Sequence, residues 1–159
     1  MGGAFTVPGN TVPHAEFNML VDPEAAKQVF SAGLPDLTAV GLDVTGQVSL
    51  DRETWEAARA VGSTPDAAPA AWLTATVYAK EFGHGREPST HLHDPLAVAV
   101  ALDPGLVGCE DAAVTVDTAE GHEGATRIAG PGPVKVALSV DGDRFLERLR
   151  DRLGVVPRR

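Results

Sequence analysis

Two short segments carry side chains that could bind a polar ligand and move a proton. The first places an amide, a carboxylate and a second amide close together, at Asn10, Glu16 and Asn18. A carboxylate with two amides can accept from and donate to the hydroxyls of a sugar. The second segment places His93 beside Asp94. A histidine can protonate a leaving group near neutral pH, and a carboxylate can ligate calcium. The two segments together predict a site for a hydroxyl-rich ligand.

Each of these residues also has an ordinary structural interpretation. Asn10 could shape a turn, and Asn18 could cap the chain ahead of the following helix. Asp94 could cap the helix that Pro95 begins, although a cap and a metal ligand do not exclude each other. His93 could be a partly buried histidine whose hydrogen bonds are satisfied within the fold. The residues alone leave both interpretations open.

Further histidines and a cysteine raise other possibilities. His91 and His93 lie on the same side of an extended chain, and with His84 they could bind zinc. No cysteine or second carboxylate pair completes such a site at typical spacing, but a small zinc protein stays a third interpretation. Cys109 is the single cysteine of the chain, which excludes an intrachain disulfide and favours a reducing compartment. Nothing nearby indicates an activated thiol, so we expect a structural role.

The sequence predicts the helices that would position the two segments. Asp22-Pro23 is a cap and first-turn proline, and Gly33 stands where a helix of this length ends. Four further helices are predicted by capping residues and apolar spacing: Asp51 to Gly62, Asp66 through Trp72 and Tyr78 to Gly83, Leu96–Leu102 after Asp94-Pro95, and a terminal helix with Phe145, Leu146, Leu149 and Leu153 on one face.

Strand signals alternate with these helices. Met1–Phe5 could be the end of a buried strand, and the polar stretch Gly83–Thr90 reads as a loop. Four further segments are predicted as strands by apolar content or alternation: Leu37–Val44, Val114–Asp117 paired with Thr126–Ala129 as a hairpin, and Val134–Val140. The alternation predicts an α/β fold with helices packed on a sheet.

Composition excludes some classes of protein. The chain has 159 residues, the length of one domain, and a formal net charge of −9, which argues against a nucleic-acid partner. No apolar run is long enough for a transmembrane helix, and no signal peptide is visible. We therefore expect a cytoplasmic protein without membrane or nucleic-acid partners.

The order of these motifs resembles the inosine-uridine preferring nucleoside hydrolase family. The shared features are the glycine-rich segment after Met1, the triplet Glu16-Phe17-Asn18, the segment Leu42–Thr45 and the motif His93-Asp94-Pro95. The resemblance implies a mainly parallel sheet flanked by helices, here followed by a C-terminal β-hairpin and helix. It also implies hydrolysis of a ribonucleoside to ribose and free base, in a protein that commonly forms homo-oligomers.

The resemblance assigns roles to individual residues. His93 would protonate the departing base, and Asp94 would ligate Ca2+ and touch the ribose. The other substrate-binding residues that it implies are Met1, Asn10, Glu16, Phe17 and Asn18 around the ribose and Tyr78 and Phe82 around the base. Tyr78 and Phe82 are four residues apart on one predicted helix face, so ordinary packing is an equal alternative. The segment Leu42–Thr45 reads as a strand end that feeds a turn.

The chain departs from the family at one motif. The family's Asp-x-Asp-Pro-Gly-x-Asp-Asp cluster, which supplies most calcium ligands and the base that activates water, is absent. We therefore expect residues 1–159 to be the C-terminal portion of one nucleoside hydrolase-like domain, with an incomplete calcium site and no hydrolase activity alone. The alternative is a non-catalytic protein that binds nucleosides or ribose, or acts with a partner chain. The preferred base stays open.

Overall fold

The computed structural model describes residues 1–83 and 88–155. They form two compact units. Unit 1 contains residues Met1–Gln47 and His93–Val140, and unit 2 contains Val48–Leu92 and the segment from Asp141 onward. Each unit draws on two separate stretches of sequence, so contacts between distant residues hold each one together.

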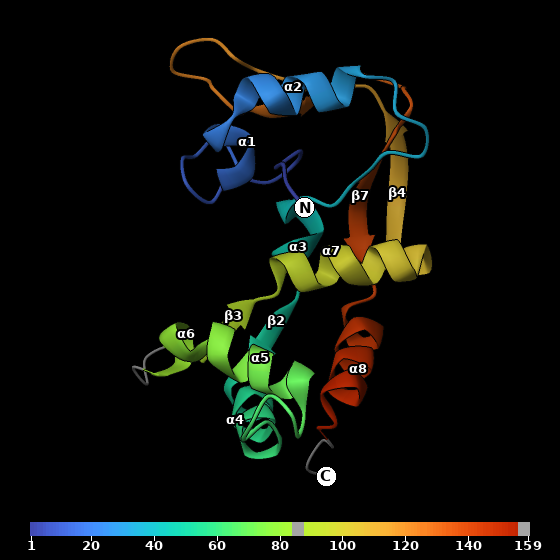
Figure 1. The fold of residues 1–159 in the computed structure, drawn as a ribbon. Coiled ribbons are helices and arrows are strands. Elements are labelled where there is room, and N and C mark those ends of the chain that lie inside the picture. Colours follow the sequence, from blue (N-terminus) through green and yellow to red (C-terminus); the bar gives the residue numbers. More distant parts are fainter. Residues whose placement is uncertain (84–87, 156–159) are drawn as a thin grey trace. The chain divides into compact units, whose positions relative to one another are not determined.

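A three-stranded sheet forms the centre of unit 1. Its order is β1 (Thr38–Ala39), β7 (Val134–Val140) and β4 (Val107–Ala112), with β1 parallel and β4 antiparallel to β7. Figure 1 shows β7 beside β4. Small buried side chains fill its core; Phe5 and Phe30 pack against them and contact each other edge to face. These core residues are Ala39, Ala112, Val134 and Val136. β7 spans the residues predicted for it.

Helices and a hairpin complete unit 1. The helices are α1 (Phe17–Val21), α2 (Pro23–Ser31), α3 (Leu42–Thr45), α7 (His93–Leu102) and the 3-10 turn η1 (Pro104–Leu106). Asp22 caps α2 by accepting the Ala25 N–H at 2.9 Å, and Gly33 follows the helix with a φ of 64°, as predicted. The predicted hairpin is confirmed as antiparallel strands β5 (Val114–Val116) and β6 (Thr126–Ile128).

Two strand predictions in unit 1 are wrong. Met1–Phe5 is irregular, and Gly3 has a φ of 97° that an extended strand does not use. Leu37–Val44 contains only the two residues of β1, and Leu42–Thr45 is the helix α3. The chain turns at Gly41, whose carbonyl accepts the Thr45 N–H at 3.1 Å, while the Leu42 N–H donates to Gly3 at 2.8 Å. Helical hydrogen bonding therefore replaces strand pairing.

Unit 2 is mainly helical. It contains the antiparallel pair β2 (Ser49–Asp51) and β3 (Ser89–His91), together with α4 (Arg52–Val61), α5 (Pro69–Val77), α6 (Ala79–Gly83) and α8 (Gly142–Leu153). The Trp55 ring stacks on Phe82 with centroids 5.1 Å apart. Phe145 and Leu153 of α8 are buried, as the predicted apolar face requires.

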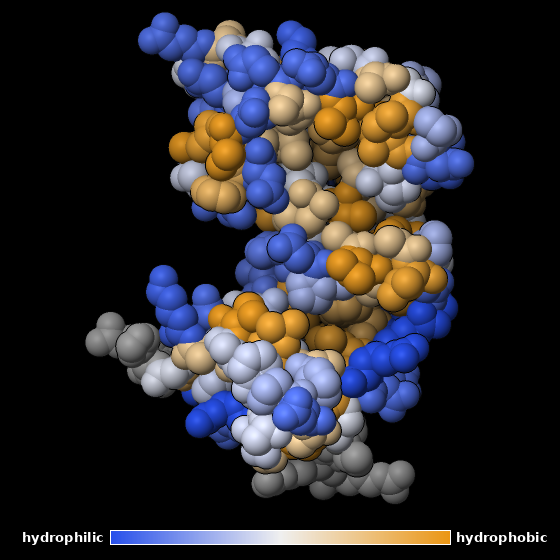
Figure 2. Space-filling model, viewed as in Figure 1, coloured by the Kyte–Doolittle hydropathy of each residue, from blue (hydrophilic) through white to orange (hydrophobic). Residues whose placement is uncertain are grey.

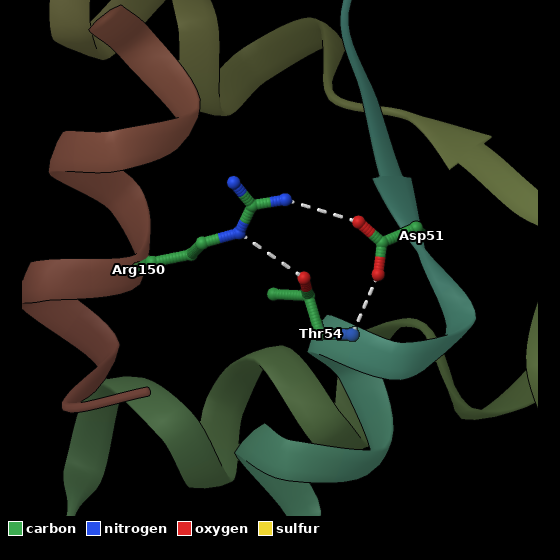
Figure 3. A network of polar contacts seen from close by, with 3 residues as sticks. All are labelled: Asp51, Thr54 and Arg150. Atoms are coloured by element: carbon green, nitrogen blue, oxygen red, sulfur yellow. Dashed lines mark hydrogen bonds and ion pairs between the residues drawn. The ribbon is translucent and has the colours of Figure 1, made fainter. Parts of the chain in front are cut away.

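Polar contacts link α8 to the start of α4. Asp51 caps α4 by accepting the Thr54 N–H at 2.6 Å, as predicted, and Arg150 donates to Asp51 at 3.1 Å and to the Thr54 hydroxyl at 3.3 Å (Figure 3). Burial alone would raise the pKa of Asp51. The hydrogen bonds from Thr54 and the nearby Arg150 outweigh it, so the pKa of Asp51 is lowered.

The single helix predicted from Asp66 to Gly83 is wrong in two respects. It begins at Pro69, because a proline disfavours the helical conformation of the residue before it, and Ala68 is accordingly non-helical. It also divides into α5 and α6 at Tyr78, which ends α5. The predicted loop Gly83–Thr90 contains the beginning of β3.

The α/β class is confirmed, including the C-terminal hairpin and helix. The sheet pairing differs from the mainly parallel arrangement that we expected: of the strand pairs in the described residues, β1 with β7 is parallel and the other three are antiparallel. Among the same residues, no helix combines the length and apolar character needed to cross a bilayer.

Candidate functional site

The predicted site residues divide between the two units. Unit 1 holds those assigned to the ribose and to proton transfer, namely Met1, Asn10, Glu16, Phe17, Asn18, His93 and Asp94. Unit 2 holds Tyr78 and Phe82. The candidate site is therefore built within unit 1.

Glu16 organises the first of the two segments. Its side chain is buried, and its carboxylate accepts three backbone N–H groups: Asn18 at 3.0 Å on Oε1, and Gly3 at 3.1 Å and Met19 at 3.4 Å on Oε2. Glu16 thus caps α1 and fixes the glycine-rich segment against it. A carboxylate can accept further hydrogen bonds, so a ribose contact of Glu16 stays a prediction.

The two amides lie at the surface beside Glu16. Asn10 accepts the Phe17 N–H at 3.0 Å, and Asn18 Nδ2 lies 3.4 Å from the Met1 carbonyl and 3.6 Å from the Met1 sulfur. Asn10, Phe17 and Asn18 are exposed. The backbone fixes both amides while leaving them accessible to a ligand.

Asp43 of α3 holds the same N-terminal segment from the other side. It is buried, and its carboxylate accepts the Phe5 N–H at 2.9 Å, the Thr6 N–H at 2.7 Å and the Thr6 hydroxyl at 2.6 Å. The backbone of the segment from Gly3 to Thr6 is therefore bonded to two buried carboxylates, Glu16 and Asp43.

The second segment meets the same helix. Thr45 at the end of α3 is fully buried, and its Oγ1 lies 2.8 Å from Nδ1 of the half-buried His93. α7 begins at His93, so Asp94 lies in its first turn rather than ahead of it as a cap. Asp94 is exposed, where its oxygens can accept hydrogen bonds from a ligand.

The two aromatic candidates do not form a matched pair. Phe82 is 1% exposed, with Trp55 stacked on it and Arg52 5.2 Å from the centre of its ring. Its ring packs in the core of unit 2, as the packing alternative expects, and its contact with a nucleobase stays a prediction. Tyr78 ends α5, and its base contact stays a prediction.

The sequence raised two possible metal sites, one for calcium and one for zinc. Within residues 1–83 and 88–155, no three His, Cys, Asp or Glu side chains lie close enough to hold a metal ion. Asp94 offers calcium one carboxylate, and these residues do not complete the site. For zinc, His91 Nδ1 lies 3.2 Å from the Ser49 hydroxyl, and His84 lies outside the described residues.

The sequence interpretation missed Asp43 and Thr45 as site residues. The motif Leu42–Thr45 was a visible signal, but it was interpreted as a strand end and a turn. Only the fold shows that this helix contacts both the N-terminal stretch and His93, because Asp43 and Thr6 are 37 positions apart and Thr45 and His93 are 48 apart.

The chain is similar in sequence and in structure to known ribonucleoside hydrolases. The chain is 37% identical over 98% of its length to the pyrimidine-specific ribonucleoside hydrolase RihA of a Shewanella species, and 37% identical over 96% to that of Escherichia coli. Its structure resembles a purine-preferring ribonucleoside hydrolase from Gardnerella vaginalis with a TM-score of 0.79, at 33% identity over 96% of the chain. The chain spans about half the length of these proteins, between 50% and 51%.

The family model for inosine-uridine preferring nucleoside hydrolases matches residues 1–147. The match covers both site segments and α3, including Glu16-Phe17-Asn18 and His93-Asp94. This chain therefore belongs to the inosine-uridine preferring nucleoside hydrolase family.

Proposed function

We propose that this chain supplies the ribose-binding and proton-donating part of a ribonucleoside hydrolase site. The observation that carries the proposal is that α3 contacts His93 and also the glycine-rich stretch up to Thr6, whose Gly3 N–H is bonded to Glu16. Asp43 binds the N-terminal segment through Thr6, and Thr45 contacts His93. Family membership supports the reaction class, the cleavage of an N-glycosidic bond to ribose and free base.

The residues of unit 1 suit two steps of this reaction. Asn10 and Asn18 present exposed amides, and Asp94 an exposed carboxylate, to the hydroxyls of a ribose. His93 then donates a proton to a nitrogen of the base as the glycosidic bond breaks and its electron pair passes to the base. The ribose carbon, left electron-deficient, forms a bond to a water oxygen, and the proton that this water loses passes to the solvent.

Calcium remains a proposal from the family resemblance. Calcium takes roughly six to eight oxygen ligands, and Asp94 supplies one carboxylate. We therefore expect the chain alone to bind ribonucleosides without turning them over. The alternative function, nucleoside or ribose binding without catalysis, makes the same prediction for the isolated chain.

The test measures binding and turnover separately. Amide chemical shifts are followed while inosine or uridine is added, and ribose release is measured with and without calcium. We expect shifts at Asn10, Asn18 and His93 and no ribose release. Asn18→Ala should weaken binding about tenfold, the loss of about 1.4 kcal/mol. Gln28→Ala, which removes an exposed amide from α2, is the matched control.

The two readouts distinguish the outcomes. Unchanged shifts with both nucleosides would contradict the proposed site. Binding with calcium-dependent ribose release would confirm the hydrolase and show that the expected inactivity is wrong. Both bases are used because the similar proteins include a pyrimidine-specific and a purine-preferring enzyme.

Association of identical copies is a further part of the proposal. From Pro95 onward the sequence of α7 is apolar on all sides, and its Val98 and Leu102 are 61% and 83% exposed. Helices that are apolar all round are normally covered. Figure 2 shows hydrophobic surface over α7, which supports a contact with a second copy.

We also keep the cytoplasm as the proposed location, because the single cysteine suits a reducing compartment.

A further inference from the structure

We propose that Thr45 is a positioning residue for His93: its hydroxyl accepts the proton on Nδ1, so the proton given to the base leaves from Nε2. The inference rests on the proposed role of His93 and adds the residue that fixes its ring. It starts from the 2.8 Å separation between Thr45 Oγ1 and His93 Nδ1.

The element that carries Thr45 is suited to hold a ring in place. All four residues of α3 are buried, and the helix packs against both β7 and α7. Its N-terminal side is bonded to the glycine-rich segment through Leu42 and Gly3, and Asp43 is bonded to Phe5 and Thr6. Threonine has a stiff side chain because its Cβ is branched, so the hydroxyl has few positions available.

The direction of the hydrogen bond follows from the proton that His93 must deliver. A histidine that protonates a leaving base begins with hydrogen on both ring nitrogens and ends neutral, with one. If Nε2 releases the proton, Nδ1 keeps its hydrogen in both states. An oxygen that accepts from Nδ1 therefore stabilises the ring before and after transfer. A hydroxyl that donated to Nδ1 would oppose the charged form.

The burial of Thr45 makes its hydrogen bond with His93 difficult to replace. Thr45 is 0% exposed, so water cannot readily replace its hydroxyl as the acceptor of the Nδ1 proton. A buried donor that loses its partner costs free energy, and the ring would rotate or change tautomer to regain one. Thr45 would thus set both the orientation of His93 and the nitrogen that carries the transferable proton.

The test reads the tautomer directly and needs no turnover. Long-range 1H–15N spectra of the histidine rings are recorded for the chain at a pH where His93 is neutral, and His93→Gln identifies its signals. We expect His93 to carry its hydrogen on Nδ1. Thr45→Val should lose this pattern, whereas Thr45→Ser, which keeps the hydroxyl, should retain it. Thr115→Val, at an exposed position of β5 in the same unit, is the matched control.

Each outcome decides the inference. An Nε2–H tautomer in the unaltered chain would overturn it, and this result does not depend on whether any variant folds. An Nδ1–H tautomer that survives Thr45→Val would overturn it as well. Nucleoside binding, followed by the amide shifts of Asn10 and Asn18, is measured in the same samples. Failure of the proposed function would remove those shifts and leave the tautomer result intact.

Discussion

The carboxylate of Glu16 accepts the backbone N–H of Gly3 at 3.1 Å, across 13 positions of sequence. A residue predicted to bind ribose is therefore also a buried support for the segment that begins the site. Glu16→Gln replaces one acceptor oxygen with a donor that faces backbone N–H groups. We expect a loss of about 1–3 kcal/mol in the free energy of unfolding of unit 1 and faster hydrogen exchange at Gly3 and Asn18.

Urea unfolding followed by amide exchange measures this loss. Glu110→Gln, at an exposed position of β4 in the same unit, is the control and should change stability by less than about 0.5 kcal/mol. Equal stability of the Glu16 and Glu110 variants would show that the Glu16 carboxylate contributes no support.

A second prediction concerns Asp43. Its two oxygens accept three donors from Phe5 and Thr6, and an amide at this position can accept on only one atom. Asp43→Asn should increase hydrogen exchange at the amides of Phe5 and Thr6 at least about tenfold, the equivalent of about 1.4 kcal/mol. Asp111→Asn, on exposed β4, is the comparison. Unchanged exchange at Phe5 and Thr6 would mean that this carboxylate does not hold the segment.

A third prediction concerns the acid stability of unit 2. Because the pKa of Asp51 is lowered from 3.8 in the folded chain, its charged form favours folding above that value. This contribution is lost as the pH falls below 3.8 through the folded pKa. Asp51 is partly exposed, so we expect less than about 1 kcal/mol.

Asp51→Asn isolates the charge, because asparagine is also a good helix cap. The two tryptophans of the chain, Trp55 and Trp72, lie in unit 2, so their fluorescence reports its unfolding. The variant should be less stable than the parent chain at neutral pH, and the two should converge in acid. A constant difference at all pH values would contradict the linkage.

A fourth prediction concerns Cys109. The partial burial of its thiol raises its pKa, Lys135 lowers the pKa by less, and the nearby Asp111 adds a smaller increase. Fewer thiolates are then present near neutral pH, so alkylation should be slower in the folded chain than in urea. Asp111→Asn should accelerate the reaction, and Lys135→Met should slow it. Mass spectrometry after timed iodoacetamide treatment measures these rates, and a folded chain that reacts faster than the unfolded one would contradict this prediction.

A fifth prediction concerns the exposed face of α7. Val98 and Leu102 are four residues apart and lie on one side of the helix. Leu102→Lys should weaken association of copies in light scattering after gel filtration. Leu73→Lys, at a 56% exposed position of α5, should have a smaller effect. A monomeric parent chain at all concentrations would contradict the proposed homo-oligomer.

The sequence alone determined the elements that local chemistry specifies. Asp22-Pro23 and Gly33 bounded α2, Asp51 and Gly62 bounded α4, and the apolar alternation of Val134–Val140 identified β7. Capping, turn and periodicity signals depend on residues that are close in sequence, so they can be recognised without knowledge of the folded structure. The motifs Glu16-Phe17-Asn18 and His93-Asp94 are also made of neighbouring residues, so the family could be identified from them.

Only the tertiary structure decided what joins those motifs. β4 has mostly exposed residues and no alternation, and it is a strand because it pairs with β7. Leu42–Thr45 has the composition of a strand, but Gly41 and distant hydrogen bonds make it a helix. The contacts of Asp43 and Thr45 span 37 and 48 positions, beyond the reach of any local pattern. The site residues could thus be recognised from sequence motifs, whereas Asp43 and Thr45, which hold the site in place, could be identified only from long-range contacts.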